Sequence, residues 1–167
     1  FDYKFYDHAD KLSAAWIWSR IRRIGRSLTS LMEEKLGALE GGSRTLHLFN
    51  LHLGLGEAER REQLRRLLET PNLQSIHART PTLVAGDFND VWGTLGKRVL
   101  VPAGFTGPSR PIRTFPAWAP VRSLDSLYVR GDLEVLDLCR PRTKLARLAS
   151  DHVPLLASLR VPPPATS

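Results

Sequence analysis

Four short segments of the sequence contain residue types that can bind a metal ion, orient a water molecule and contact a phosphate. A phosphate ester is hydrolysed when a hard cation held by carboxylates neutralises charge on the ester oxygen. The reaction also uses a carboxylate that activates or orients water, and donors that hold the developing oxyanion. The residues that could supply these functions are, in chain order, Asn50 and His52, Asp87 and Asn89, Asp125, and Asp151 and His152.

Each segment has a simpler explanation when it is considered alone. Asp87 and Asn89 follow an apolar run and can form a turn, because such side chains bond to nearby backbone. A single histidine such as His52 often packs at the rim of a core. Asp125 is costly inside an apolar strand unless it is paired or faces water at a sheet edge. The occurrence of all four segments in one chain favours a shared catalytic site.

The elements that must position these residues are mostly strands. Residues 45–53 predict a buried strand whose alternation places Asn50 and His52 on the same face as Leu46 and Leu48. Leucines at helical spacing predict a helix over residues 57–69. Further strands are predicted over 81–86, 112–115, 123–129, 133–138 and 153–161, with one or two helical turns over 90–99 and a loop over 102–111. This order predicts a mixed α/β domain with an antiparallel tendency late in the chain.

The composition narrows the function classes. The 24 Lys and Arg residues outnumber the 17 Asp and Glu residues, so the net charge is +7. A positive charge attracts anionic substrates, but it also fits a compositional bias toward arginine. No apolar run reaches the roughly 20 residues of a membrane-spanning helix. The single cysteine, Cys139, excludes an intrachain disulfide and a cysteine-rich zinc site. The Gly54-Leu55-Gly56 turn lacks the third glycine of a dinucleotide fingerprint, and no G-x-S-x-G or H-E-x-x-H motif occurs.

In their order, these motifs resemble those of the endonuclease/exonuclease/phosphatase superfamily, from about residue 36 to residue 161. The resemblance rests on Asn50-Leu51-His52-Leu53-Gly54, Gly86-Asp87-Phe88-Asn89, Leu124-Asp125-Ser126-Leu127-Tyr128-Val129 and Ser150-Asp151-His152, together with Thr114-Phe115. That superfamily includes deoxyribonuclease I-like nucleases, exonuclease III-like repair enzymes, inositol polyphosphate phosphatases and neutral sphingomyelinases. The resemblance implies a hydrolase of phosphate esters that depends on Mg²⁺ or Mn²⁺. The most direct expectation is a monomeric phosphodiesterase that acts on nucleic acid or on phospholipid or inositol-type esters, with no obligate protein partner.

The resemblance also assigns roles to the acidic residues and to one histidine. Asp151 matches the C-terminal metal ligand, and His152 matches the histidine that contacts the scissile phosphate. Asp125 matches the carboxylate that orients this histidine. Asp87 matches the residue that positions or deprotonates the attacking water, or protonates the leaving group.

The remaining candidate residues would contact the substrate. Asn89 matches the phosphate-orienting amide, and His52 matches a second phosphate-contacting histidine. Further substrate-contacting candidates are Asn50, Thr114, Arg113 and Trp118. A tryptophan at this position can equally cover the rim of a core.

Two geometric predictions follow from these roles. Asp125 and His152 should lie within hydrogen-bond distance on adjacent antiparallel strands, although 27 residues separate them in the sequence. The carboxylate should then raise the pKa of His152, because it stabilises the imidazolium. Asp87 and Asn89 should converge on the same pocket, with His52 on its far wall.

The first half of the family's domain is not recognisable in this chain. It normally supplies a metal-binding glutamate that follows a glutamine, whereas Glu33, Glu34 and Glu40 follow other residues. Because the sequence also begins with Phe1, we expect the C-terminal part of a longer enzyme. The expected fold is α/β, a partial four-layer αββα sandwich with mostly one sheet and flanking helices.

The domain organisation expected from this comparison has three parts. Residues 33–161 form the C-terminal part of the catalytic domain, and residues 162–167 form a disordered tail. Residues 1–32 form a basic segment with helical spacing of apolar residues. The face that bears Leu46 and Leu48 should turn toward a missing sheet.

Two functions without catalysis remain open. The domain could keep the fold and bind a ligand without hydrolysing it, since the chief metal-binding glutamate is not identified. It could also be an adaptor for membrane or nucleic-acid surfaces that works through Trp16, Trp18 and the arginines at 20–26. The lack of a secretory pattern and of disulfides predicts a cytoplasmic location.

Overall fold

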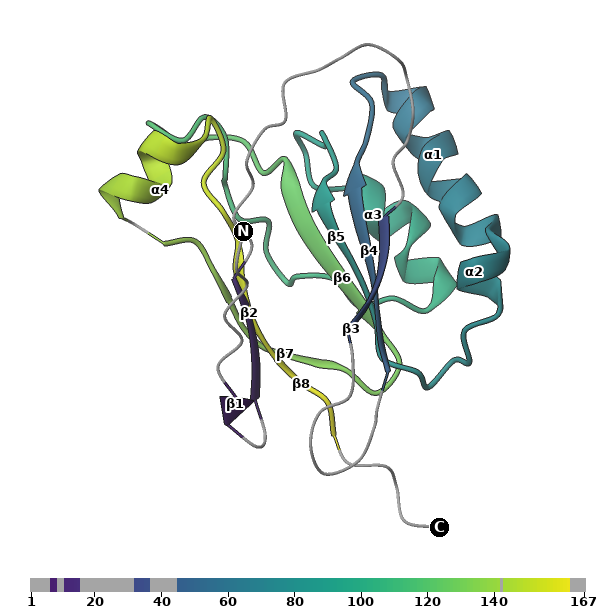
Figure 1. The fold of residues 1–167 in the computed structure, drawn as a ribbon. Coiled ribbons are helices and arrows are strands. Elements are labelled where there is room, and N and C mark those ends of the chain that lie inside the picture. Colours follow the sequence, from purple (N-terminus) through teal and green to yellow (C-terminus); the bar gives the residue numbers. More distant parts are fainter. Residues whose placement is uncertain (1–6, 9–10, 16–31, 37–44, 142, 163–167) are drawn as a thin grey trace.

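The strands of the described residues divide equally between two sheets that pack against each other (Figure 1). The computed structural model describes residues 7–8, 11–15, 32–36, 45–141 and 143–162. The first sheet has the order β3 (Met32–Leu36), β4 (Leu46–His52), β5 (Thr82–Asp87) and β6 (Asp125–Arg130). The second has the order β1 (Asp7–His8), β2 (Lys11–Ala15), β8 (Leu156–Arg160) and β7 (Glu134–Cys139). The α/β sandwich is therefore confirmed, whereas the expectation of mostly one sheet is wrong.

Strand register brings three predicted site residues to one edge of the first sheet. β4 and β5 are parallel, and His52 lies opposite Asp87 in their pairing. β5 and β6 are antiparallel, and Asp87 lies opposite Asp125. The carboxyl ends of β4 and β5 thus meet the amino end of β6. Because residues predicted to be catalytic lie there, we call this edge the catalytic end.

The two faces of β4 bury apolar residues against different layers. Leu46 and Leu48 pack between the sheets with Ala157 and Leu159 of β8. The alternate positions face the helices and include Phe49, Leu51 and, just beyond the strand, Leu53. The predicted alternation is confirmed, and the face of Leu46 and Leu48 meets a second sheet that the chain itself supplies.

Helices cover the outer face of the first sheet (Figure 1). α1 spans Glu57–Glu69, the predicted range, and buries Leu64 and Leu67 in the core. The layer is completed by α2 (Pro71–Gln74), α3 (Leu95–Val99) and a 3-10 turn, Val101–Ala103. Among the described residues, no helix is both long and apolar enough to cross a membrane.

Three details differ from the sequence-based expectations. Residues 112–115 form no strand, only an isolated bridge between Phe115 and Arg122. The flanking residues Pro111 and Pro116 have no backbone N–H to extend a ladder. A short helix, α4 (Lys144–Ala149), was not expected. Strands β1 and β2 fall within residues 1–32, while the helical pattern at 16–31 and the tail after residue 162 lie outside the described residues.

Candidate active site

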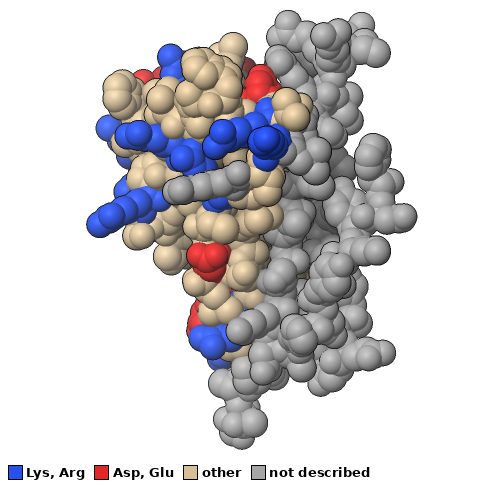
Figure 2. Space-filling model, turned by 90° about the vertical axis from the view of Figure 1, so that its left-hand side faces the viewer, with Lys and Arg blue, Asp and Glu red and all other residues tan. Residues whose placement is uncertain are grey.

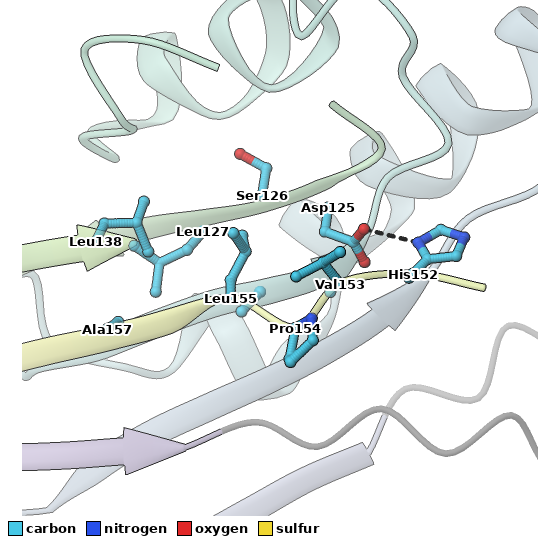
Figure 3. Close-up of a pocket in the computed structure, with 11 residues that line it drawn as sticks. Asp125, Ser126, Leu127, Leu138, His152, Val153, Pro154, Leu155 and Ala157 are labelled. Carbon is cyan, nitrogen blue, oxygen red and sulfur yellow. Dashed lines mark hydrogen bonds and ion pairs between the residues drawn. The ribbon is translucent and has the colours of Figure 1, made fainter. Parts of the chain in front are cut away.

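A hydrogen bond between Asp125 and His152 joins the two sheets at the catalytic end (Figure 3). The Nδ1 atom of His152 lies 2.7 Å from Oδ2 of Asp125. Asp125 begins β6 in the first sheet, whereas His152 lies in the turn that precedes β8 in the second. The predicted proximity is confirmed. The predicted adjacency is wrong, because the two segments belong to different sheets.

The surroundings hold the His152 ring in one orientation. The Phe115 ring packs against it with 5.0 Å between centroids, and the backbone N–H of His152 donates to Oγ of Ser150 over 3.2 Å. A small apolar pocket, which includes Leu127 and Leu138, lies between the sheets beside the pair (Figure 3). The ring therefore presents its second nitrogen, Nε2, toward Asp87 at 3.9 Å from Oδ2.

Opposing influences act on the pKa of His152. Burial is the largest single one and lowers it, because a charged ring is poorly solvated there. The hydrogen bond and the charge of Asp125, followed by the charges of Asp87 and Asp151, together outweigh burial. The pKa of His152 is therefore raised, which favours an imidazolium that donates from both ring nitrogens.

Asp87 occupies the centre of the site. Its Oδ1 accepts a hydrogen bond of 2.8 Å from the backbone N–H of Asn89, and its Oδ2 lies 3.9 Å from Nε2 of both His52 and His152. Burial and then the charge of Asp125 raise the pKa of Asp87, although the Asn89 N–H and the two histidines act in the opposite direction. A carboxylate with a raised pKa is a stronger base than an ordinary aspartate.

Gly86 sets the spacing between the strands that carry His52 and Asp87. It has φ of +135°, and a Cβ atom there would meet the carbonyl oxygen of Leu51 at 2.1 Å. Because Leu51 is its partner across β4 and β5, any side chain would force these strands apart. Residue 86 must therefore be glycine for β4 and β5 to approach each other this closely.

Asn89 ties the loop after β5 to the end of β4. Its Nδ2 donates to the carbonyl of Leu53 over 2.6 Å, and its backbone is left-handed with φ of +48°. Asparagine tolerates this conformation better than most residues. The structure brings Asn89 to the same end as Asp87, as predicted, with one amide hydrogen already used by the protein.

Thr114 lies beneath the site. It is fully buried, so a direct contact with substrate, as we expected, does not fit its position. Its carbonyl accepts from the N–H of Val153 over 2.8 Å, and its Oγ1 accepts from the N–H of Asp125 over 3.4 Å. Thr114 therefore clamps the segments that carry Asp125 and His152.

The other predicted substrate-contacting residues, Arg113 and Trp118, lie outside the group formed by Asp87, Asp125 and His152. Arg113 is exposed, and its carbonyl accepts from the guanidinium of Arg140 over 2.9 Å. Trp118 is 79% exposed in a loop whose Ala117 N–H donates to the carbonyl of Asp151. Both residues border the catalytic end without a hydrogen bond between their side chains and the Asp–His pair.

Two carboxylates and an amide oxygen at this end are donors of the kind that a hard divalent cation takes. Atoms of Asp87, Asp125 and His152 lie within 4.8 Å of one another, a group that, among the described residues, does not include the exposed Asp151. Asn50, two residues before His52, has a buried Oδ1 without a hydrogen-bond partner within the described part of the chain. Carboxylate and amide oxygens are ligands that Mg²⁺ accepts, whereas a protonated His152 is not a ligand.

Two supporting residues were not singled out as site residues by sequence. Phe115 packs on the His152 ring, and Ser150 accepts from the His152 backbone. Both lie inside motifs that carried the resemblance, so proximity in the motif was the available signal. Their packing and capping roles became visible only from the geometry.

Comparison with known proteins agrees with this geometry. The model of the endonuclease/exonuclease/phosphatase family matches residues 13–152. The chain belongs to this family. Uncharacterized protein YbhP of Escherichia coli strain K12 is 37% identical over 123 residues, which are 71% of this chain and 47% of YbhP. The chain thus spans about half the length of the curated relatives it matches.

Solved structures of the family share the fold. The endonuclease/exonuclease/phosphatase from Bacteroides vulgatus has a TM-score of 0.65 at 18% identity, with coverage of 95% of this chain and 67% of that one. D. rerio TDP2, complexed with a single strand DNA product, has a TM-score of 0.56 at 16% identity, with coverage of 78% and 67%. At these identities the likeness concerns the deoxyribonuclease I-like fold.

Proposed function

We propose that this chain carries the phosphate-activating half of a divalent-metal-dependent phosphodiesterase. Family membership supports phosphoesterase-type hydrolysis. The observation that carries the finer proposal is the hydrogen-bonded Asp125–His152 pair, with Asp87 within 3.9 Å of both histidines. This arrangement sets a hydrogen-bond donor beside a carboxylate that can act as a base, the two functions that hydrolysis of a phosphate ester uses.

The charges of the site define the proposed roles. The imidazolium of His152, held by Asp125, donates from Nε2 to a non-bridging phosphate oxygen and stabilises its growing negative charge. His52 faces the same carboxylate from the end of β4 and would contact the phosphate from the other wall. Asp87 orients water and takes its proton as the new P–O bond forms. The ester P–O bond breaks, and the leaving alkoxide takes a proton from solvent and departs as the alcohol.

A divalent cation would be held by carboxylate oxygens at this end, with Asp151 as the exposed candidate ligand that the family motif indicates. Asp87 and Asp125 already have partners within the protein, and His152 is better suited to donate to phosphate. When bound, the cation supplies charge neutralisation on the ester oxygen. We propose Mg²⁺ or Mn²⁺, which prefer such oxygen ligands.

Hydrolysis of bis(p-nitrophenyl) phosphate by the longest natural form of the protein tests the proposal. We expect p-nitrophenolate release that requires Mg²⁺ or Mn²⁺, stops with EDTA and is lost in Asp125→Asn. Arg66→Ala, on the exposed face of α1, serves as a control that keeps activity. Activity that persists in EDTA would exclude the metal-dependent mechanism.

The alternative is a domain of this fold that binds a phosphate ester without hydrolysing it. It is favoured by Glu33, Glu34 and Glu40, none of which follows a glutamine as the family's metal-binding glutamate does. Saturable binding of the diester that survives Asp125→Asn, without turnover in either protein, would support this alternative.

A further inference from the structure

The most exposed apolar side chains of the described residues gather around the catalytic end. Five large apolar side chains are more than 60% exposed, whereas other exposed ones, such as Leu136 at 40%, are clearly less so. We call these five residues the apolar rim. They are Leu55 at 83%, Trp92 at 81%, Trp118 at 79%, Val121 at 62% and Leu148 at 84%.

Connectivity places each member of the rim beside the site. Leu55 lies in the connection from β4 to α1, and Trp92 lies in the connection from β5 to α3. Trp118 and Val121 lie in the loop that is bonded through Ala117 to the carbonyl of Asp151. α4, which contains Leu148, runs directly into the turn of the catalytic histidine. These connections lie at the upper end of Figure 1, on both sides of the sandwich.

Basic side chains accompany the apolar rim on the α4 side. Arg113, Arg122, Lys144 and Arg147 are all exposed there. Figure 2 shows Lys and Arg side chains across the upper part of the face that contains α4, with acidic side chains sparse among them. An apolar rim bordered by positive charge is the pattern of a surface that binds an anionic, partly apolar partner.

We propose that the catalytic end docks on the surface of an anionic phospholipid bilayer, with the apolar rim inserted at the interface. Tryptophan prefers the boundary between headgroups and acyl chains, and aliphatic side chains gain by leaving water for that boundary. The basic side chains complement anionic headgroups. Nucleic acid fits less well, because Leu55, Val121 and Leu148 have no aromatic face on which a base can stack.

Docking itself requires no hydrolysis and can be tested apart from it. That the ester cleaved at this surface belongs to a phospholipid headgroup does rest on the proposed function. In the docked arrangement the Asp125–His152 pair faces headgroup phosphates without extraction of a lipid, because rim residues flank it on both sides. The bilayer would thus present the substrate and hold the enzyme.

Vesicle sedimentation in EDTA measures docking without turnover. The probes are vesicles of phosphatidylcholine with roughly one-third phosphatidylglycerol, and vesicles of phosphatidylcholine alone. We expect binding that is at least about tenfold tighter on the anionic vesicles and that weakens in high salt. Leu148→Ser and Trp118→Ala should each weaken it about tenfold, because each removes a large side chain from the interface. Leu136→Ser, on β7 away from the rim, should leave it unchanged.

Three results would overturn the proposal. One is vesicle binding that is equal in the rim variants and the Leu136→Ser control, with circular dichroism showing all of them folded. Another is stronger binding to a single-stranded oligonucleotide than to vesicles, lost in Trp118→Ala but not in Leu148→Ser. The third is a dimer in light scattering that the rim variants dissociate, without vesicle binding. Failure of the hydrolysis assay with docking intact would count only against the proposed function.

Discussion

The two histidines that flank Asp87 are equally distant from it and yet differ in how they are held. The Nε2 atoms of His52 and His152 each lie 3.9 Å from Oδ2 of Asp87. The side chain of His152 is 16% exposed and is fixed by Asp125 and the Phe115 ring, whereas that of His52 is 57% exposed. Distance to the central carboxylate therefore does not rank the two residues. Burial and orientation predict that His152 dominates catalysis, because water screens interactions of His52.

Removing either member of the buried pair should give the largest loss. We expect His152→Ala and Asp125→Asn each to lower kcat on a phosphodiester about 1000-fold, since they act as one preorganised unit. The double variant should be little worse than either single variant. Losses that multiply in the double variant would show that the residues act independently.

Asp87→Asn should lower activity about a hundredfold while raising stability in urea unfolding at neutral pH. The pKa of Asp87 is raised above its ordinary 3.8 by burial and by Asp125, so its charged form opposes folding. This cost is absent at pH values below the ordinary pKa and appears as pH rises through the raised one. The gain in Asp87→Asn should therefore vanish in acid, and a loss of stability at neutral pH would contradict this account.

His52→Ala should reduce kcat by roughly three- to tenfold, because its side chain is half exposed and its contacts are screened. The comparison between the histidines depends on this difference. A loss of kcat as large as that of His152→Ala would show that the two histidines contribute equally.

The smallest expected effect is a change in the pKa of His152, which proton NMR can measure. It should lie above the ordinary 6.5 and should fall in Asp125→Asn, because the hydrogen bond and charge of Asp125 oppose the effect of burial. The raised pKa means that protonation of His152 stabilises the fold. This contribution is complete below pH 6.5 and is lost as pH rises through the pKa of the folded state. A pKa of His152 that is unchanged by Asp125→Asn would show that Asp125 does not stabilise the imidazolium. The electrostatic part of the difference between His152 and His52 would then be wrong.

Much of the helix and strand order could be predicted from local sequence patterns, and the family motifs indicated which residues converge at the catalytic end. The range Glu57–Glu69 followed from the spacing of leucines, because one buried stripe defines a helix. α4 was missed, because six residues give too little periodicity to recognise. The assignment of Asp125 and His152 to adjacent strands failed, because the pairing of distant strands depends on the packing of the whole sandwich rather than on either segment.

Burial distinguishes two residues, Thr114 and Trp118, to which the sequence assigned the same role. Thr114 and Trp118 were both expected to contact substrate, yet Thr114 is fully buried and Trp118 is 79% exposed. The Thr114-Phe115 motif identifies the region but not the direction of each side chain, because residues 112–115 lack the regular alternation of a strand. The flanking prolines were visible in the sequence and would have argued against a ladder here.

The hydrogen bond from His152 to Asp125 makes the geometry of the site depend on the packing of the two sheets. Because its two ends belong to different sheets, neither sheet can form the pair by itself. The bond exists only after the sheets have docked, and a slight separation of the layers breaks it while leaving the strands of each sheet paired. Gentle heating should consequently abolish the proposed hydrolysis before the strands unfold. Loss of that activity would then detect separation of the two sheets at a lower temperature than far-ultraviolet circular dichroism does.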